Sequence, residues 1–258
     1  MVQDFREKYR PKSFSTFVGD KRTIKILTNI VKSAHLPKGM LIYGPAGSGK
    51  TSLAQVFMKA LYCQSFSEDV CGECEECLSF EKLFSRISQW PYVFDCTRIS
   101  EKVLEEIFQN TFWPPQRMGR QIYIFDEFHR AKVPLQEKLL KPLETQEDRL
   151  VIFCLIDLKT VGEAFRQRVT VLKTNRPEFD ELIFWLQRIC DSEGIIIKDG
   201  NALRQIALSA DRLPRECLGL LEKVYLLGEP LSTSLAKELA QDNRGDHSDK
   251  PQYRIFGE

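Results

Sequence analysis

Short apolar runs alternate with longer segments of helical periodicity over the first two thirds of the chain. In the segment 21–33, apolar residues recur at the three- and four-residue spacing of a helix that buries one face. The runs are nearly continuous in apolar residues, which is typical of strands buried on both faces of a parallel sheet. The predicted strands are 40–43, 92–95, 122–125, 150–154 and 169–172. This order predicts an α/β fold in which helices cover both faces of a parallel sheet.

The strand pattern stops after Asn175, and the following segment has only helical periodicity. Apolar residues at helical spacing predict helices over 179–190, 202–210 and 214–227. We therefore expect an α/β domain over 1–175 and a small all-helical domain over 176–240. From 241 onward the sequence is polar, and we expect a disordered tail over 241–258. A helical domain directly after an α/β domain suggests a lid.

Composition places the chain among soluble globular proteins. Its 258 residues, 43% of them hydrophobic, are enough for about two cores. There is no stretch of about 20 apolar residues that could span a membrane, and the segment after Met1 lacks the apolar core of a signal peptide. We therefore expect a cytoplasmic protein without a membrane partner. The net charge of +1 argues against a uniformly basic nucleic-acid coat, although Lys and Arg gathered on one face could still contact DNA phosphates.

A glycine-rich segment lies between the first predicted strand and the next amphipathic run. It consists of Gly44, Pro45, Ala46, Gly47, Ser48, Gly49, Lys50 and Thr51. Such glycines can take positive φ and let backbone N–H groups approach phosphates, while the following helix points its positive end at the same anion. Lys50 would then reach the β- and γ-phosphates of a nucleotide, and the Thr51 hydroxyl would bind Mg²⁺. The pattern also arises by chance in glycine-containing turns, but a strand before it and a helix after it favour a phosphate-binding loop.

Two acids end the predicted strand 122–125. Asp126 would hold Mg²⁺, directly or through water, and Glu127 would orient and deprotonate an attacking water. Many strands end in Asp-Glu only for solvation, so this signal is weak alone. It gains weight because a neighbouring strand could place both acids beside Thr51. We interpret His129 as a surface residue rather than a catalytic base, since Glu127 nearby can already act as the base.

Half of the eight cysteines fall close together in the sequence, as Cys63, Cys71, Cys74 and Cys77. Four thiolates are the ligand set of a closed tetrahedral Zn²⁺ site, which is structural rather than catalytic. An iron–sulfur cluster also uses four cysteines, but the closing Cys-Pro of the bacterial ferredoxin run is missing. Two disulfides or free thiols remain open as alternatives, although a cytoplasmic location disfavours disulfides. The remaining cysteines are expected to be small buried hydrophobes; they are Cys96, Cys154, Cys190 and Cys217.

Together these motifs resemble those of the bacterial clamp-loader ATPases of the AAA+ class, the gamma/tau and delta-prime subunits of DNA polymerase III. The resemblance extends from Phe5 to about Leu227. It rests on Lys8-Tyr9-Arg10-Pro11, Phe17-Val18-Gly19-Asp20, the phosphate loop, the four-cysteine insert at 63–77, Asp126-Glu127-Phe128-His129 and the helix 136–144. It implies an AAA+ P-loop domain followed by a helical lid, with ATP bound between them. The implied ATP-binding residues are Tyr9, Arg10 and Val18 near the adenine, with the phosphate loop and Ser52.

In this family an arginine finger from a Ser-Arg-Cys motif reaches the ATP of the next subunit. The corresponding residues here are Gln167, Arg168 and Val169, so the serine and the cysteine are absent. Arg168 is our candidate, because an arginine that reaches across an interface can stabilise charge on the transferring phosphoryl group. Arg166 competes with it, and both could instead be ordinary solvated cations.

Two further positions of the family sense the γ-phosphate. The strand that should end in small polar residues ends here in Leu155 and Ile156, which cannot hydrogen-bond a phosphate. Asp157 follows them, and its negative charge near the phosphates favours slow or conditional hydrolysis. In the lid, Arg215 resembles the second sensor and would contact the γ-phosphate, unless it is an ordinary exposed arginine.

Two functions of different class remain open. The first is a clamp-loader ATPase subunit that needs ATP, Mg²⁺ and Zn²⁺ and has five catalytic residues, namely Lys50, Asp126, Glu127, Arg168 and Arg215. Its expected partners are other clamp-loader subunits, the sliding clamp and primed DNA, which it would contact at phosphates without sequence preference. The second is a catalytically weak or inactive interaction subunit in the role of delta-prime. A small-molecule kinase is less favoured, because the sequence has no motif for an acceptor substrate.

Overall fold

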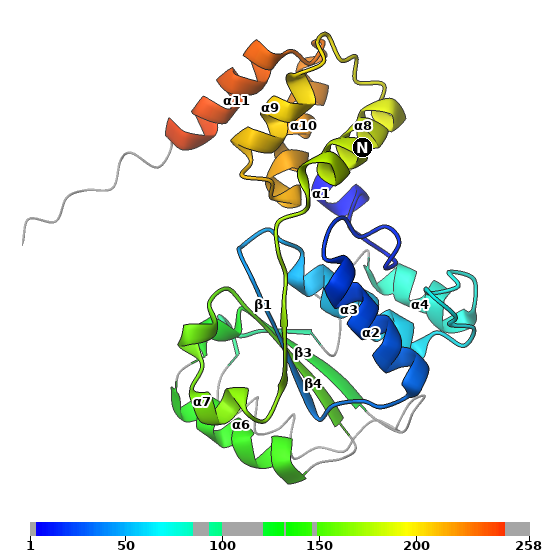
Figure 1. The fold of residues 1–258 in the computed structure, drawn as a ribbon, viewed down its shortest axis with the longest axis vertical. Helices are drawn as coiled ribbons and strands as arrows, with labels where there is room; N and C mark the ends of the chain where they lie inside the picture. The colour runs from blue at the N-terminus through cyan, green and yellow to red at the C-terminus, as the bar shows by residue number, and fades with distance from the viewer. Residues whose placement is uncertain (1–3, 85–92, 100–120, 132, 146–148, 246–258) are drawn as a thin grey trace, which may run out of the picture. The chain divides into compact units, whose positions relative to one another are not determined.

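The computed structural model describes residues 4–84, 93–99, 121–131, 133–145 and 149–245 (Figure 1). The chain divides into two compact units. The α/β unit is Tyr9–Arg176, and the helical unit combines Met1–Lys8 with Pro177–Glu258. The boundary between the units after Arg176 falls next to the domain boundary expected from the sequence at 175. The grouping of the first eight residues with the helical unit differs from the expected division, which placed them in the α/β domain.

A five-stranded parallel sheet forms the centre of the α/β unit, with the order β2-β3-β4-β1-β5. Its strands are β1 Gly39–Tyr43, β2 Val93–Asp95, β3 Gln121–Asp126, β4 Arg149–Leu155 and β5 Thr170–Lys173. The central strands β3, β4 and β1 are buried along nearly their whole length. This double-sided burial is why their sequences are continuous apolar runs rather than alternating ones. The predicted parallel α/β sheet is therefore confirmed.

Helices cover both faces of this sheet (Figure 1). Because successive side chains of a strand point to opposite faces, Met40 and Ile42 lie in one core and Leu41 in the other. The first core also contains the apolar side chains of α2 Lys21–Ser33 and α3 Lys50–Tyr62. The second core contains side chains of α6 Val133–Thr145 and α7 Glu163–Arg166. The described residues of the unit also form α4 Glu75–Phe84, η2 Phe128–Arg130 and η3 Leu158–Thr160.

Over residues 4–8 and 177–245, the helical unit contains the three helices predicted from periodicity and two more. Its helices are α1 Phe5–Lys8, α8 Phe179–Glu193, α9 Ala202–Ser209, α10 Pro214–Leu227 and α11 Thr233–Gly245. Helix α11 was not predicted, and it continues five residues beyond the expected end of the helical domain at 240. Of the tail expected at 241–258, residues 241–245 are thus helical, and residues 246–258 lie outside the described part of the chain.

The short helix α1 is held in the helical unit by one aromatic side chain and two polar contacts. Phe5 is fully buried, with its ring 5.4 Å from that of Tyr225. Its backbone N–H donates to Glu222 Oε1 at 3.2 Å, and the Lys8 ammonium lies 2.6 Å from Glu193 Oε1. A single helical turn is unstable by itself, so these tertiary contacts are what hold it.

None of the helices in the described ranges combines the length and the apolar character that crossing a membrane requires.

Candidate functional site

The phosphate loop, residues 44–51, connects the carboxyl end of β1 to the start of α3. Two of its glycines are required by their surroundings. A Cβ atom at Gly44 would lie 2.2 Å from Thr174 Oγ1, closer than atoms can approach. Gly49 has a φ of +87°, and a Cβ atom there would lie 2.9 Å from the ring of Phe17. The loop is therefore enclosed tightly on two sides, by Thr174 and by Phe17.

The Lys50 side chain folds back onto the start of this loop. Its ammonium donates hydrogen bonds to Gly44 O at 3.0 Å and Pro45 O at 2.9 Å. Burial lowers the pKa of Lys50, and the negative charges of Glu127 and Asp126 oppose that shift. The ammonium of Lys50 is thus held by two backbone carbonyls of the loop that precedes it.

The Thr51 hydroxyl and the Asp126 carboxylate meet directly. Thr51 Oγ1 donates to Asp126 Oδ2 at 2.8 Å, from the first turn of α3 to the last residue of β3. A hydroxyl and a carboxylate oxygen in contact are a donor set that suits Mg²⁺, which prefers oxygen ligands and binds through one or two carboxylates. The sequence predicts that the phosphate loop and the acidic pair lie side by side, and the fold brings them together at the carboxyl edge of the sheet.

Glu127 follows Asp126 in an unusual backbone conformation. Its φ is +53°, a left-handed value that is uncommon for a residue with a side chain. Its carboxylate Oε2 lies 3.3 Å from His129 Nε2, and the His129 side chain is only 13% exposed. The expectation that His129 is a surface residue was therefore wrong, because it is largely buried and in contact with the candidate base. The only sequence signal was the two-residue spacing between them.

Thr174 is a residue of the site that sequence reasoning missed. It follows β5 directly and is fully buried. Its hydroxyl lies 2.8 Å from that of Ser48 and donates to Tyr43 O at 3.3 Å, while its backbone N–H donates to the same carbonyl at 2.8 Å. A polar residue just after the strand next to β1 was the available signal, since the carboxyl ends of parallel strands share one edge.

The end of β4 has no polar group in the place of the family's first sensor. Leu155 is fully buried and lies opposite Tyr43 in the sheet, and Gly44 N donates to Leu155 O at 3.2 Å. The Asp157 carboxylate is turned to its own loop, where it accepts from Lys159 N at 2.9 Å and caps η3. The side chains of Leu155 and Ile156 offer only apolar surface here, as the sequence indicated.

Two buried thiols lie close to the acidic pair. Burial, together with the charges of Asp126 and Asp95, raises the pKa of Cys96 to about 12. Burial also raises the pKa of Cys154 well above its usual value. Both sulfurs are therefore protonated at neutral pH and add no charge beside Asp126. The expectation that the scattered cysteines are small buried hydrophobes is confirmed, since Cys190 and Cys217 are buried as well.

The remaining candidates fall in both units. Val18 is buried in the α/β unit, where Arg10 NH1 also donates to Gln55 Oε1 at 3.5 Å, and Tyr9 is half-buried. Arg168 is held by the Glu144 carboxylate and donates to Ala164 O at 2.7 Å. Arg166 ends α7, three residues after its start. Arg215 is exposed in the first turn of α10 in the helical unit, so its role as a sensor stays a prediction.

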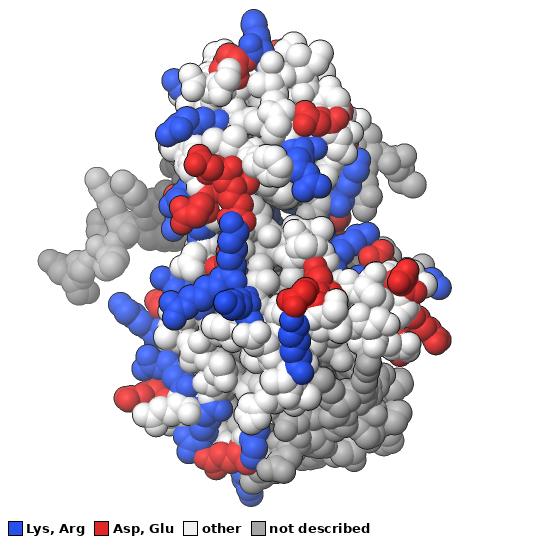
Figure 2. Space-filling model, turned by 45° about the vertical axis from the view of Figure 1, so that its right-hand side comes forward, with Lys and Arg blue, Asp and Glu red and all other residues white. Residues whose placement is uncertain are grey.

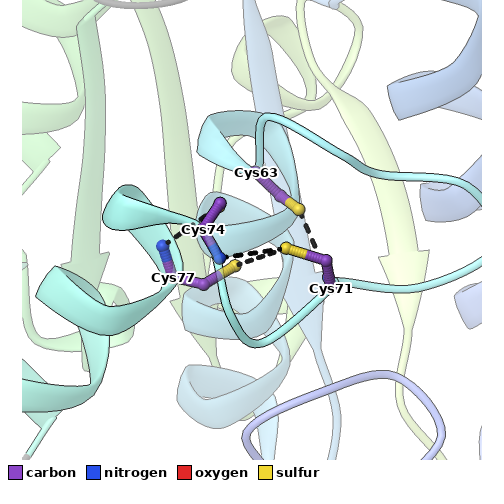
Figure 3. A group of neighbouring side chains, drawn as sticks. All are labelled: Cys63, Cys71, Cys74 and Cys77. Carbon is purple, nitrogen blue, oxygen red and sulfur yellow. Dashed lines mark hydrogen bonds between the residues drawn. The ribbon is translucent and has the colours of Figure 1, made fainter.

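The four cysteines of the insert at 63–77 form a compact cluster (Figure 3). Their sulfur atoms all lie within 4.8 Å of one another, and those of Cys71 and Cys77 are 3.9 Å apart. Tetrahedral ligation with Zn–S bonds of about 2.3 Å places two sulfurs about 3.8 Å apart, so this separation fits one ion. A disulfide would require about 2.05 Å, and all four thiols are free. The donor set and its spacing therefore fit a single Zn²⁺.

Backbone N–H groups point at these sulfurs. Cys71 N donates to Cys63 Sγ at 3.3 Å, Cys74 N to Cys71 Sγ at 3.4 Å, and Cys77 N to Cys74 Sγ at 3.5 Å. Hydrogen bonds from the Glu73 and Cys74 N–H groups lower the pKa of Cys71 to about 6, whereas burial raises the pKa of Cys63 and of Cys77. Such N–H donors stabilise thiolates, which are the form that binds a metal.

The helix α3 separates the cluster from the phosphate loop. Lys50 begins this helix and Cys63 follows its last residue. Thirteen residues at a rise of about 1.5 Å each place its two ends about 20 Å apart. A metal ion held by the cysteines cannot reach a nucleotide at the phosphate loop, which agrees with a structural role.

Comparison with solved structures defines the class of protein. The Holliday junction branch migration motor RuvB of Thermotoga maritima superposes with a TM-score of 0.66 at 16% sequence identity, over 91% of this chain and 72% of that one. At this identity the likeness shows the fold alone. The chain has the AAA+ P-loop fold, as expected from the sequence.

Comparison of sequences then identifies the family. The chain belongs to the family described as DNA polymerase III, delta subunit, whose profile matches residues 19–177. The chain is 30% identical over 234 residues to the DNA polymerase III subunit gamma/tau of Mycoplasma pneumoniae, a match that covers 89% of this chain and 34% of the relative. It is also 30% identical over 242 residues to Protein STICHEL of Arabidopsis thaliana, across 92% of this chain and 20% of that protein. The resemblance to clamp-loader proteins of the AAA+ class is thus confirmed, and the chain spans a fifth to a third of the length of these two relatives.

Proposed function

We propose that this chain binds ATP at the phosphate loop and hydrolyses it as a subunit of a DNA polymerase III clamp loader. The observation that carries the proposal is the 2.8 Å hydrogen bond between Thr51 and Asp126, which joins the phosphate loop to the acidic pair. Membership of the DNA polymerase III delta family supports the assignment to a clamp loader.

Mg²⁺, when bound by Thr51 and Asp126, neutralises charge that develops on the phosphates. The Lys50 ammonium exchanges its two carbonyl acceptors in the loop for oxygens of the β- and γ-phosphates. Glu127 orients a water and takes its proton as the water oxygen bonds to the γ-phosphorus. The bond from this phosphorus to the bridging oxygen breaks at the same time, leaving ADP and phosphate. Arg168 is proposed to serve the ATP of a neighbouring subunit, and Arg215 to contact the γ-phosphate.

The four cysteines are proposed to hold Zn²⁺ in a structural role. Their thiolates fill all the ligand positions of a tetrahedral ion, so no position is open for a substrate. An ion held there would therefore take no direct part in the chemistry of the nucleotide site, although one helix joins the two sites.

Other loader subunits, the sliding clamp and primed DNA are the proposed partners. Figure 2 shows acids and bases interspersed over the described surface, with Lys and Arg gathered along the left edge of its lower part, the α/β unit. Helix α2 contains no acid, and its exposed basic residues are Lys21, Arg22, Lys25 and Lys32. A basic surface of this kind suits phosphate contacts that are insensitive to base sequence and weaken as salt rises.

A second candidate function is a nucleotide-binding interaction subunit without useful turnover, in the role of delta-prime. It is favoured by the apolar Leu155 and Ile156 at the first sensor, and by Gln167 in place of the serine before Arg168. The contact between His129 and Glu127 also favours the interaction subunit, because it occupies the carboxylate of the candidate base.

Phosphate release and ATP binding, measured on the full chain alone and with partner loader subunits, separate the two functions. For the ATPase we expect Glu127→Gln to abolish release and keep binding, and Lys50→Met to abolish both. Glu137→Gln, at an exposed acid of α6, is the matched control and should leave both unchanged. Binding without release in every mixture would favour the interaction subunit, and the absence of ATP binding by the unmodified chain would contradict both functions.

A further inference from the structure

Asp69, in the cysteine insert, reaches a distant part of the chain. Its Oδ1 accepts a hydrogen bond from Phe14 N at 2.9 Å, and its Oδ2 accepts one from Ser15 N at 2.8 Å. Both carboxylate oxygens are thus used by consecutive N–H groups of a segment more than 50 residues earlier. Hydrogen bonds to an ionised acceptor are shorter and stronger than neutral ones, so this pair fixes the segment to the insert.

The segment held by Asp69 is packed as well as hydrogen-bonded. Phe14 is buried, and its ring meets that of Phe66 in the insert edge to face, with centroids 6.5 Å apart. Phe17 N donates to Phe14 O at 3.2 Å, which closes a tight turn between the two aromatic residues. The position of Phe17 therefore depends on where Asp69 and Phe66 hold Phe14.

Phe17 in turn forms a wall of the phosphate loop. Its ring lies so close to Gly49 that a Cβ atom added there would be 2.9 Å from it. Gly49 is the residue that directly precedes Lys50 and Thr51 at the start of α3. Val18, an expected adenine contact, follows Phe17 in the sequence. A shift of residues 14–17 would therefore change the loop and the neighbouring nucleotide wall together.

The other end of this connection is the sulfur cluster. Asp69 lies two residues before Cys71, whose N–H donates to Cys63 Sγ at 3.3 Å. Because Cys63 caps α3, an ion that joined the four sulfurs would fix the insert, and Asp69 with it, against the end of that helix. The cluster thus contributes to where the Asp69 carboxylate lies relative to α3.

A buried lysine makes a second set of contacts between the insert region and the segment before Phe17, in addition to those of Asp69. Lys59 of α3 is 1% exposed, and its ammonium donates to Lys12 O and to Glu81 Oε1, each at 3.3 Å. Burial alone would raise the pKa of Glu81, but the hydrogen bond and charge of Lys59, with the charge of Lys12, lower it. Glu81 lies on α4, the helix that carries Cys77. The contacts of Asp69 and those of Lys59 therefore both join the metal-binding part of the chain to the segment before Phe17.

We propose that Asp69 is a positioning residue that couples metal binding by the four cysteines to nucleotide binding at the phosphate loop, about 20 Å away along α3. The proposal rests on the proposed function, since it requires a nucleotide at the loop. Metal-bound cysteines hold Asp69, Asp69 holds Phe14 and Ser15, and Phe17 then supports Gly49. By thermodynamic linkage, nucleotide must strengthen metal binding by the same factor by which metal strengthens nucleotide binding.

The test measures both affinities on the full chain. A fluorescent ATP analogue reports nucleotide binding to zinc-loaded and to chelator-stripped protein, and competition with a coloured chelator reports zinc affinity with and without ATP. We expect removal of zinc to weaken binding of the analogue about tenfold, within the usual range of coupling between sites. We expect the ATP analogue to raise zinc affinity by the same factor.

Asp69→Asn tests whether Asp69 carries the coupling. The amide has one acceptor oxygen, so one of the two backbone N–H groups would face an NH₂ group instead of an acceptor. The variant should still bind zinc, should bind the analogue about tenfold more weakly, and should lose the dependence of analogue affinity on zinc. Glu68→Gln is the matched control: its side chain is 82% exposed and pairs with Lys32, so both affinities should match those of the unmodified chain. Thermal unfolding of each variant checks that the fold is kept.

The outcomes separate this proposal from the proposed function. Equal analogue affinity with and without zinc, or an Asp69→Asn variant that keeps the zinc dependence, would overturn the coupling and leave the nucleotide site intact. A zinc-loaded unmodified chain that does not bind the analogue would overturn nucleotide binding, and the coupling with it.

Discussion

The buried hydroxyls of Ser48 and Thr174 lie 2.8 Å apart, joining the middle of the phosphate loop to the residue that follows β5. Thr174 also bonds Tyr43 O at the end of β1 through both its hydroxyl and its N–H. One side chain thus links two strands and the loop between β1 and α3.

Thr174→Val removes the hydroxyl and keeps a similar shape. We expect it to lower the free energy of unfolding by about 1–2 kcal/mol, because the buried Ser48 hydroxyl loses its partner. ATP affinity should fall as well, since the loop is less firmly held. Denaturant unfolding and a nucleotide titration measure the two effects. Thr170→Val, at an exposed threonine of β5, is the control, and equal effects at both positions would contradict the prediction.

Gly49→Ala places a methyl group against Phe17 at a φ of +87°. We expect a loss of about 1–2 kcal/mol in the free energy of unfolding, since a left-handed conformation is unfavourable for alanine. Nucleotide affinity should fall in parallel, as Gly49 precedes Lys50. Gly162→Ala is the matched control, because a Cβ atom there meets open space. The prediction is wrong if both alanine variants unfold at the same denaturant concentration.

Cys77→Ala is expected to lose bound zinc and to unfold at lower temperature, because three thiolates close a tetrahedral site poorly. Elemental analysis of purified protein measures the metal, and we expect about one zinc ion per unmodified chain. Cys217→Ala removes a buried thiol outside the cluster and should keep the metal in full. Zinc content that is equal in the two variants would rule out the cysteine cluster as its site.

The helical unit should lose stability in acid through Asp199. Hydrogen bonds from the Thr233 hydroxyl at 2.5 Å and the Thr233 N–H at 2.8 Å lower the pKa of Asp199 below its usual 3.8. A carboxyl whose pKa is lower in the folded state stabilises the fold above its unfolded pKa, and this contribution disappears as pH falls through the folded pKa. The stabilisation is therefore present at pH 5 and is lost progressively below about pH 4.

Asp199→Asn should remove that part of the pH dependence and be less stable than the unmodified chain at pH 5. Thermal unfolding midpoints at pH 5 and pH 3 measure the difference between the two proteins. Glu238→Gln, at an exposed acid on α11, provides the comparison. An Asp199→Asn variant with the full pH dependence of the unmodified chain would show that this carboxyl does not contribute.

The sheet could be predicted because every strand leaves a local trace. Strands β1, β3 and β4 are buried on both faces, so each is an apolar run whose end is marked by glycine or by acids. The meeting of Thr51 with Asp126 followed from the shared carboxyl edge of parallel strands. Local pattern and the topology rule were therefore enough for the centre of the site.

Contacts between distant, weakly patterned segments could not be predicted in this way. The bonds from Asp69 to Phe14 and Ser15 join two loops, and nothing in either loop indicates the other. The same holds for Phe5, a single aromatic residue in one helical turn, whose partner Tyr225 lies far along the chain. Helix α11 was missed because its sequence is largely polar, and its buried side is limited to a few residues such as Ala236 and Leu239.

The grouping of Phe5–Lys8 with the helical unit means that the polypeptide passes between the two units twice, after Lys8 and after Arg176. Two peptide linkers, rather than one, therefore connect the two units. A chain cut only within the second linker would leave two fragments still associated, because α1 stays in its site against α10 while covalently joined to the α/β unit. Removing the first eight residues would take away the contact between Phe5 and Tyr225 in the helical unit. It would also leave one peptide linker between the two units instead of two.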